Sequence, residues 1–256
     1  VNLFNPAQLG SAGRLIQCVK MGSLPNLPEN PNHLCNLPLI TAVELMAHEI
    51  GHQWMSWIEI DLDDGRGPIP ILRGWESDSP NGHWSAWYNS GSVMYGGILT
   101  DNGNGTFTDI NGPRKYSQLD QYLMGLRTAA EMDEMWLVDV DGSNQGNPAM
   151  PWTPGSVTEL TGTRVNFDID AVIRVHGPRI PALDKCHYKV GFAIVHPMGL
   201  PPSPQEIAKV DAYRLALETW WPWGTDYRSS LDTTLDGCGT GTDQCTGEQS
   251  AQCGLP

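Results

Sequence analysis

The sequence predicts an α+β fold in which a small twisted sheet packs on one helix and a second helix supports it. Three observations carry this prediction. A capped amphipathic helix begins after Thr41, and short stretches typical of strands and turns follow between residues 83 and 109. Glycine and proline are frequent, with 28 and 20 among the 256 residues. This composition is typical of short strands joined by long loops rather than of a helical bundle.

The helix after Thr41 is the clearest element of the chain. Thr41 and Glu44 form a capping box, because the hydroxyl and the carboxylate can each satisfy a backbone amide at the helix start. Apolar side chains then recur at spacings of three and four residues, which places them on one helical face. We expect the helix to extend to about Ile58. The apolar face consists of Val43, Ala47, Ile50, Trp54 and Trp57.

The other expected elements follow in chain order. Residues 83–88 and 92–95 have the composition of strands separated by a turn. A second helix is predicted from Ser117, with Gly125 near its end. Further elements are expected as strands at 14–19 and 188–195, and as a helix from Pro204 with Ser203 as its cap.

The chain has no firm domain boundary. The best candidate is a loop at 141–164, rich in glycine, proline and asparagine. It would separate a core of residues 1–140, which contains the helix after Thr41, from a C-terminal subdomain of residues 141–256 that packs on the core. The chain begins with Val1 and no charged-then-apolar leader follows, so we expect a mature or excised product. The stretch before His48 is short for a sheet, so either later strands complete the sheet or an N-terminal part is missing.

The charge balance argues against one class of partner. The formal net charge is −14 at pH 7, whereas a nucleic-acid-binding protein needs a basic face to neutralise phosphates. The sequence contains no run of about 18 apolar residues, so we expect no membrane span. Three acidic clusters are interpreted first as solvated loops, with a Ca²⁺ site built from oxygen ligands as the alternative. These clusters are Asp61–Gly65, Asp101–Asp109 and Asp139–Gly142.

The six cysteines are interpreted as disulfide partners. None belongs to a CxxC pair, which counts against a zinc site made of thiolates. The segment between Cys18 and Cys35 is rich in proline and asparagine and has no core of its own, so we expect a bridge between these two residues. We expect Cys186 to pair with one of the three cysteines after residue 235. Because disulfides form in oxidising compartments, the protein is predicted to be secreted.

The segment His48–His52, with the sequence HEIGH, carries the chemistry of the chain. Two histidines four residues apart on a helix project from one face, so both imidazoles can reach one zinc ion at about 2.0–2.1 Å. Glu49 projects about 100° further round the helix, beside the ion. There it can take a proton from a zinc-bound water and pass it to a leaving amine.

Residues 47–54, AHEIGHQW, resemble the active-site helix of the zincin metallopeptidases. The chain does not follow a single branch of that group. At the position of the third histidine in metzincins this chain has Ile58. At the position of the glutamate ligand in the thermolysin-like members it has Leu72. Ser92–Tyr95, in contrast, is similar to the metzincin Met-turn.

Three further segments, residues 82–85 (GHWS), 101–107 (DNGNGTF) and 116–126 (YSQLDQYLMGL), resemble those of a group of secreted bacterial proteins that also carry an HExxH helix. This resemblance covers most of the chain. It implies a zincin-like fold, but it brings no settled substrate. In the expected fold, the substrate cleft lies between the sheet edge and the motif helix.

The third zinc ligand is open between Asp120, His83 and Glu76. We expect Asp120, because its setting after Ser117 is similar to the aspzincin pattern, in which an aspartate on a second helix completes the site. The competing interpretation is that an acid three residues after a serine cap simply stabilises the helix N-terminus. His83 is the second candidate, either as a ligand or as a catalytic group that stabilises the oxyanion. Glu76, in a polar loop, is the third.

These residues predict a secreted zinc-dependent endopeptidase with Glu49 as general base, acting on a protein or peptide substrate. Two alternatives remain open: a zinc hydrolase of a non-peptide amide, and a non-catalytic binding module that keeps the fold. An intact Glu49 favours the two enzymes, because a silent module needs no base beside the ion. The sequence leaves the oligomeric state open.

Overall fold

The computed structural model describes residues 16–35, 40–76, 79–110, 112, 114–140, 158–184 and 186–234 of the chain. These residues form a mixed α+β structure with small, mainly antiparallel sheets and four α-helices, so the predicted fold class is confirmed at that level. The helices are α1 (Ala42–Gly51), α2 (Gln118–Met124), α3 (Asp170–His176) and α4 (Pro204–Gly224). Two short 3₁₀ segments are η2 (Leu24–Asn26) and η3 (Ala129–Glu131).

The largest sheet has the strand order β1-β2-β6-β8, with antiparallel neighbours, and β3 pairs in parallel with β2. A second, antiparallel sheet has the order β4-β5-β7, and β9 and β10 form a parallel pair. The strands are β1 (Arg73–Glu76), β2 (Ser79–Asn89), β3 (Tyr95–Gly97), β4 (Leu99–Asp101), β5 (Thr106–Asp109), β6 (Met135–Asp139), β7 (Thr158–Thr161), β8 (Thr163–Phe167), β9 (His187–Lys189) and β10 (Ser230–Asp232).

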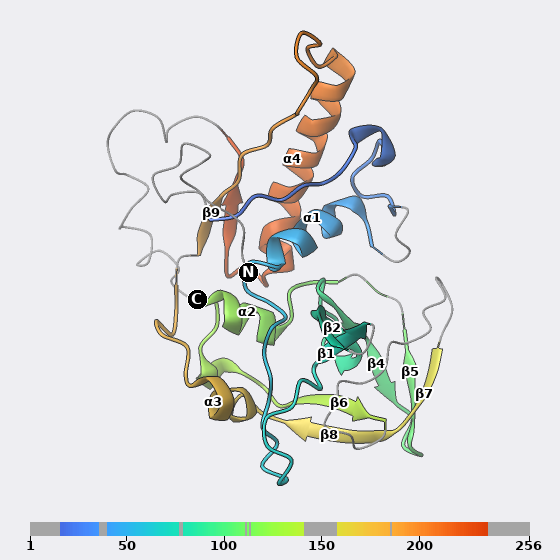
Figure 1. Ribbon diagram of the computed structural model, residues 1–256, viewed down its shortest axis with the longest axis vertical. Helices are drawn as coiled ribbons and strands as arrows, with labels where there is room; N and C mark the ends of the chain where they lie inside the picture. The colour runs from blue at the N-terminus through green and yellow to red at the C-terminus, as the bar shows by residue number, and fades with distance from the viewer. Residues whose placement is uncertain are drawn as a thin grey trace.

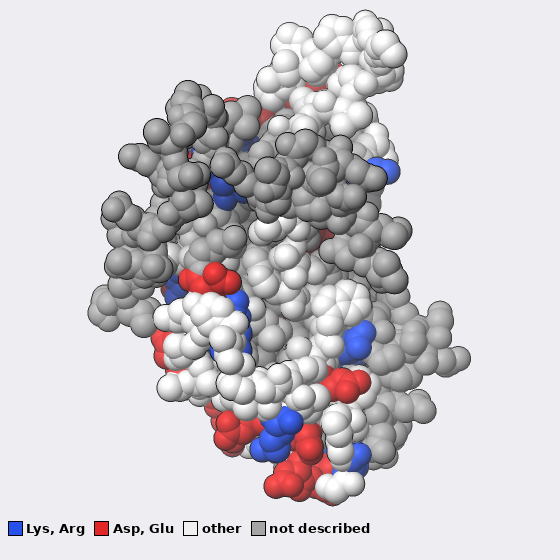
Figure 2. Space-filling model, turned by 60° about the vertical axis from the view of Figure 1, so that its left-hand side comes forward, with Lys and Arg blue, Asp and Glu red and all other residues white. Residues whose placement is uncertain are grey.

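Helices α1 and α4 pack against each other above the sheets, and α2 lies between this helix pair and the sheets (Figure 1). Charged side chains gather at the lower end of the face shown in Figure 2, whereas the projecting upper end is mostly uncharged. The uncharged end includes the segment that leads into α4, since residues 190–203 contain no Lys, Arg, Asp or Glu.

The motif helix α1 begins as the sequence predicts and ends earlier. Thr41 is the N-cap, and both hydrogen bonds of the capping box with Glu44 are present. We expected the helix to continue to about Ile58, but it ends at Gly51. The amides of Gln53 and Trp54 donate to carbonyls three residues back, which tightens the last turn and ends the α-helix.

The early end of α1 changes the environment of its expected apolar face. Trp57 is 59% exposed rather than buried. Its ring lies beside Gly82 and beneath the guanidinium of Arg73, 5.4 Å from the ring centroid. The chain that leaves the helix therefore passes along β1 and β2, the strands that bring the third histidine to the site.

The second predicted helix is confirmed as α2. Ser117 and Asp120 form its capping box, and Gly125 ends it with a left-handed φ of 77°. The helix from Pro204 is also confirmed, with Ser203 as its cap. The expected strand at 188–195 is shorter and lies at His187–Lys189. Residues 16–19 of the expected first strand have no strand structure.

An aromatic core fixes α1 against the C-terminal helix. Trp221 is fully buried, and its ring centroid lies 5.5 Å from those of Tyr116 and Tyr188. The Tyr116 hydroxyl donates to the carbonyl of Ala47, directly before the first histidine, at 2.5 Å. The core therefore reaches the turn of α1 that carries His48 through one phenol.

The expected Cys18–Cys35 bridge is not formed, because both cysteines are free. The side chain of Gln17 donates to the carbonyl of Glu49 at the end of α1, whereas the Cys35 thiol donates to Ile40 before its start. The two cysteines therefore lie near opposite ends of a helix about 15 Å long. Cys186 is disulfide-bonded, and its expected partners after residue 235 lie outside the described residues.

None of the helices in the described part of the chain combines the length and the apolar composition that a membrane span requires. Residues 158–164, expected to be loop, instead form β7 and the start of β8. Residues 141–157 lie outside the described part of the chain, so the proposed domain division there stays a prediction.

Candidate metal centre

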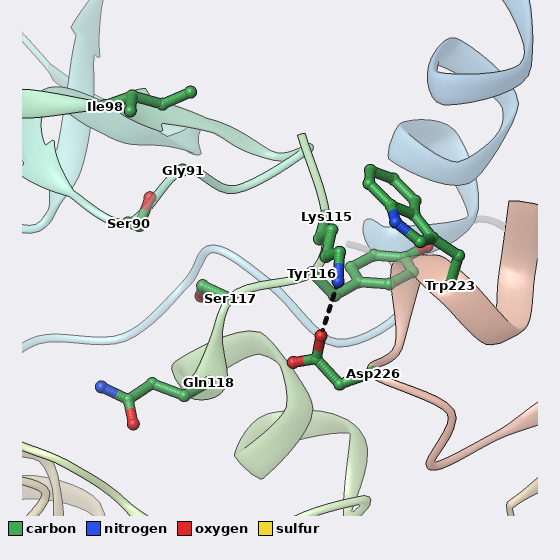
Figure 3. A pocket seen from close by; sticks show the side chains of 9 residues that line it. All are labelled: Ser90, Gly91, Ile98, Lys115, Tyr116, Ser117, Gln118, Trp223 and Asp226. Atoms are coloured by element: carbon green, nitrogen blue, oxygen red, sulfur yellow. Dashed lines mark hydrogen bonds and ion pairs between the residues drawn. The ribbon is translucent and has the colours of Figure 1, made fainter. Parts of the chain in front are cut away.

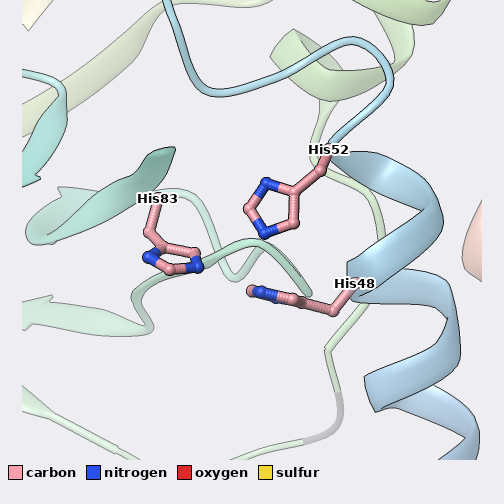
Figure 4. Close-up of side chains that lie close together, drawn as sticks. All are labelled: His48, His52 and His83. Atoms are coloured by element: carbon pink, nitrogen blue, oxygen red, sulfur yellow. The ribbon is translucent and has the colours of Figure 1, made fainter. Parts of the chain in front are cut away.

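Three imidazoles converge at the end of α1 (Figure 4). His48 lies in the last turn of this helix, His52 is its C-cap, and His83 comes from β2. Ligand atoms of the three side chains all lie within 4.8 Å of one another. The ring centroids are 4.8 Å apart for the first two, and His83 lies 5.0 Å from each of them. The group could therefore hold one metal ion.

The local structure explains why these side chains meet. The spacing of four residues places His48 and His52 one turn apart on the same side of α1. Successive side chains of a strand point to opposite faces, and Trp84, only 1% exposed, points into the core. His83 therefore points the other way, towards the end of α1.

A hydrogen bond orients the first imidazole. Nδ1 of His48 lies 2.8 Å from the carbonyl oxygen of Val93. A carbonyl can only accept, so Nδ1 carries the proton and Nε2 keeps its lone pair for a metal. Such a bond from the second ring nitrogen to a backbone carbonyl is usual for histidines that bind metals. Val93 therefore selects the tautomer that the site needs.

Burial keeps two of the imidazoles neutral. It lowers the pKa of His48 to about 4, although the bond to Val93 acts in the opposite direction. Burial also lowers the pKa of His83 to about 3, and the neighbouring imidazoles of His48 and His52 lower it further. Both side chains are consequently uncharged at neutral pH, as metal ligation requires. Three imidazoles suit Zn²⁺, Cu²⁺, Fe²⁺ or Ni²⁺.

Glu49 follows the first histidine on the same helical turn, and its side chain is partly buried. Its backbone carbonyl accepts a hydrogen bond from the side-chain amide of Gln17 at 2.9 Å. The segment around Gln17 therefore lies against the end of α1 that carries the motif.

Asp120, which we expected as the third ligand, is not in the imidazole group. Its side chain is fully buried, and its oxygens accept hydrogen bonds from Trp84 Nε1 at 2.6 Å, Ser117 N at 2.6 Å and the Ser92 hydroxyl. Burial raises its pKa to about 6, against the lowering effect of these bonds. The carboxylate is thus committed to its protein donors, and His83 takes the place that we expected Asp120 to occupy.

Glu76, the last of the three residues considered as third ligand, lies in β1, where its backbone pairs with Ser79. Its side chain lies outside the described part of the structure.

Tyr95 is a residue that sequence reasoning missed at this site. Its ring centroid lies 4.8 Å from that of His48 and 4.7 Å from that of His83. Its φ of 70° is unusual for an aromatic residue and is typical of constrained functional positions. The available signal was its place directly after Met94, in the segment similar to a Met-turn.

The acidic clusters do not form a comparable group. Among the described residues, the three histidines lie close enough together to hold one metal ion, and none of the acidic clusters brings three or more His, Cys, Asp or Glu side chains together in this way. Carboxylates of the clusters pair with arginines instead: Asp64 with Arg66 at 2.7 Å, and Asp101 with Arg164 at 3.3 Å. The Ca²⁺ alternative therefore gains no support from this part of the structure.

A separate pocket of about 400 Å³ lies between the turn at Ser90–Gly91 and the end of α4 (Figure 3). Lys115 crosses it, with Nζ 2.9 Å from the Asp226 carboxylate and 4.8 Å from the ring centroid of Trp223. None of the three histidines lines this pocket. It is therefore distinct from the candidate metal centre.

Comparison of the chain with protein-family models, with curated proteins and with solved structures found no match. The function of the chain is therefore inferred from the residues of the site, from their geometry and from the motifs of the sequence.

Proposed function

We propose that this protein is a secreted zinc-dependent endopeptidase, with His48, His52 and His83 as zinc ligands and Glu49 as the general base. The observation that carries this proposal is the convergence of three imidazoles beside a glutamate on the same helical turn. A site of three protein nitrogens leaves a fourth position open, which is the arrangement of catalytic rather than structural zinc.

When bound, zinc would supply the Lewis acidity that amide hydrolysis needs at neutral pH. The protein supplies the remaining parts. His48, oriented by Val93, presents Nε2 to the site. The Glu49 carboxylate accepts a proton from the attacking water and passes it to the leaving amine nitrogen as the C–N bond breaks.

A peptide substrate is favoured over another amide by the sheet. Among the described strands, β1 is the terminal strand beside β2, which carries His83. A terminal strand can pair with an extended peptide through backbone hydrogen bonds. The zincin resemblance points to the same class of substrate.

The deciding experiment compares the wild type with Glu49→Gln. Both proteins, purified without metal affinity and supplied with zinc, should bind one zinc ion per chain. The wild type should cleave a mixed protein substrate and stop when a chelator is added. Glu49→Gln should lose about 10²–10⁴-fold in turnover, whereas Glu134→Gln, which alters an exposed acid bonded to Asn166, should cleave normally.

Each alternative outcome has a distinct meaning. A wild type that binds no transition metal removes the central claim. Full activity of Glu49→Gln removes this residue from the mechanism. Zinc binding with hydrolysis of small amides alone favours the non-peptide hydrolase, and zinc binding without any turnover favours the binding module.

A further inference from the structure

We propose that Asp120 is a positioning residue whose carboxylate joins the two chain segments that present His83 and the carbonyl partner of His48, and thereby sets the metal affinity. This inference rests on the proposed metal site, but not on the reaction catalysed there.

The position of Asp120 is unusual for a charged side chain. It is fully buried, and within the described part of the chain no Lys, Arg or His forms an ion pair with it. A buried carboxylate is costly unless hydrogen bonds compensate for the lost water. Three donors from three different segments provide this compensation: Trp84, Ser92 and Ser117.

Two of these hydrogen bonds, those to Trp84 and to Ser92, are called the two arms of Asp120. The first arm leads to His83. The indole Nε1–H of Trp84 donates to Oδ1 of Asp120 at 2.6 Å. Trp84 directly follows His83 on β2, and a fixed side chain on one face of a strand fixes the direction of its neighbour on the other face. Asp120 therefore holds the strand in the orientation that aims His83 at the site.

The second arm leads to His48. The Ser92 hydroxyl donates to Oδ2 of Asp120 and accepts from the amide of Met94 at 2.9 Å. Val93 lies between these two residues, and its carbonyl accepts the bond from His48 Nδ1 at 2.8 Å. The position of this carbonyl is therefore set through the Ser92–Met94 turn that Asp120 holds.

The two arms are also tied to each other, since the Trp84 amide donates to the Met94 carbonyl at 3.0 Å. One carboxylate thus closes a buried network that runs to two of the three imidazoles. Zinc–nitrogen bonds of about 2.0–2.1 Å tolerate little displacement. Loss of groups that orient metal ligands typically lowers metal affinity about 10–100-fold, and we expect an effect near the lower figure here.

Asp120 also belongs to the capping box of α2, because its own amide donates to Ser117 Oγ at 3.2 Å and its carboxylate accepts from Ser117 N. A purely structural role as a helix cap is the competing explanation. Ser117→Ala separates the two roles, because it removes the serine side of the cap and leaves both arms to Trp84 and Ser92 in place.

The test measures zinc affinity by competition with a chromophoric chelator, the visible spectrum of the Co²⁺-loaded protein, and the melting temperature. Asp120→Asn keeps the side-chain size but replaces one accepting oxygen by an amide donor. Ser92→Ala removes the second arm without touching the α2 cap. Both variants should lose about 10-fold in zinc affinity and show an altered Co²⁺ spectrum. Ser117→Ala should have a lower melting temperature than the wild type, whereas its zinc affinity and its Co²⁺ spectrum should stay at the wild-type values.

Wild-type affinity and spectrum in both Asp120→Asn and Ser92→Ala would overturn the proposal and leave Asp120 as a helix cap only. If Asp120→Asn fails to fold, Ser92→Ala alone decides. A wild type that binds neither metal would instead overturn the proposed function, and the positioning role with it, whereas a wild type that binds zinc without peptidase activity leaves this test intact.

Discussion

The three imidazoles of the candidate centre are held in different ways. His48 is 2% exposed and donates to Val93, whereas His83 and His52 are only partly buried. The lowered pKa of His48 has a consequence that does not depend on metal. A folded state that resists protonation loses stability when the unfolded chain takes up protons.

We expect the metal-free protein to become less stable as the pH falls from 6.5 towards 4. The folded pKa of His48 is about 4, below its usual value of 6.5, so the stability it contributes is present above pH 6.5 and is lost as the pH falls. At pH 5 this loss is about 2 kcal/mol for His48, and His83 acts in the same direction. Urea unfolding of chelator-treated protein at several pH values measures it.

The control for this prediction is His48→Asn, whose amide can still donate to Val93 but does not titrate. Its stability should depend less steeply on pH than that of the wild type. Parallel pH profiles for the two proteins would contradict the assignment of the lowered pKa to His48.

Tyr95→Phe probes the aromatic residue over the imidazoles. If its hydroxyl stabilises the charge that develops on the substrate oxygen, its removal should lower kcat by about 10²-fold. Zinc content and melting temperature should change little, because the ring that lies tilted against His48 and His83 remains. Steady-state kinetics on a peptide substrate provide the measurement, and an unchanged kcat would limit Tyr95 to packing.

The sequence predicted the local part of the site and not the distant part. His48, Glu49 and His52 follow from spacing on one capped helix, so their placement needs no tertiary information. The choice between Asp120 and His83 depends on which face of β2 meets α1. Local patterns suited both residues, and only the packing of Trp84 in the core decides between them.

At the level of elements, glycine within the motif has a packing role. A Cβ at Gly51 would overlap the Met94 sulfur and approach Tyr116 Cε1 at 3.2 Å. The helix therefore lies close against the turn that contains Met94. This close approach connects α1 with the turn whose Val93 carbonyl orients His48.

Gly51→Ala should destabilise the protein and weaken zinc binding, although alanine normally favours a helix by about 1 kcal/mol over glycine. The sign of the change is therefore decisive: the contact with Met94 predicts a lower melting temperature, and helix propensity alone predicts a higher one. Met94→Ala makes room for the new methyl group, so the double variant should lose less stability than the sum of the losses of the two single variants.

Helix starts were easier to predict than helix ends. The capping boxes at Thr41, Ser117 and Ser203 are local, and all three begin helices. The end of α1 before Trp57 is set by tertiary contacts, because Trp57 packs on Gly82 and Arg73 instead of continuing the apolar face. Periodicity in the sequence therefore extended this helix too far.

Across the whole molecule, the C-terminal helix and the motif helix depend on each other. Helix α4 packs on α1, and the amide of Tyr116 donates to the carbonyl of Gly224 at 2.8 Å. Pairing of two helices separated by most of the chain cannot be read from local patterns. The same limit applies to Cys18 and Cys35. A bridge was expected because the segment between them has no core of its own, whereas the packing of their segments near opposite ends of α1 keeps them apart.

Trp221→Ala should therefore unfold more than the C-terminal part. Removal of this fully buried ring should cost about 3–5 kcal/mol, and zinc release should coincide with the loss of helical structure in urea. Circular dichroism and a chromophoric zinc indicator follow the two events. Trp223→Ala, at a partly buried position on the same helix, should cost less. Two separate transitions, with zinc retained after the first, would instead support independent units before and after the proposed division between residues 141 and 164.

The wide spacing of the three histidines along the chain also determines when the metal site can form during synthesis and folding. While the chain is still being made, His48 and His52 can offer a metal only two nitrogens, since the third ligand, the carbonyl at Val93 and the carboxylate at Asp120 have yet to arrive. The centre assembles once β2, the Met94 turn and α2 have closed around α1. A metal site built in this way can form only after the chain from α1 to α2 has folded, so metal binding and the folding of this part of the molecule are coupled.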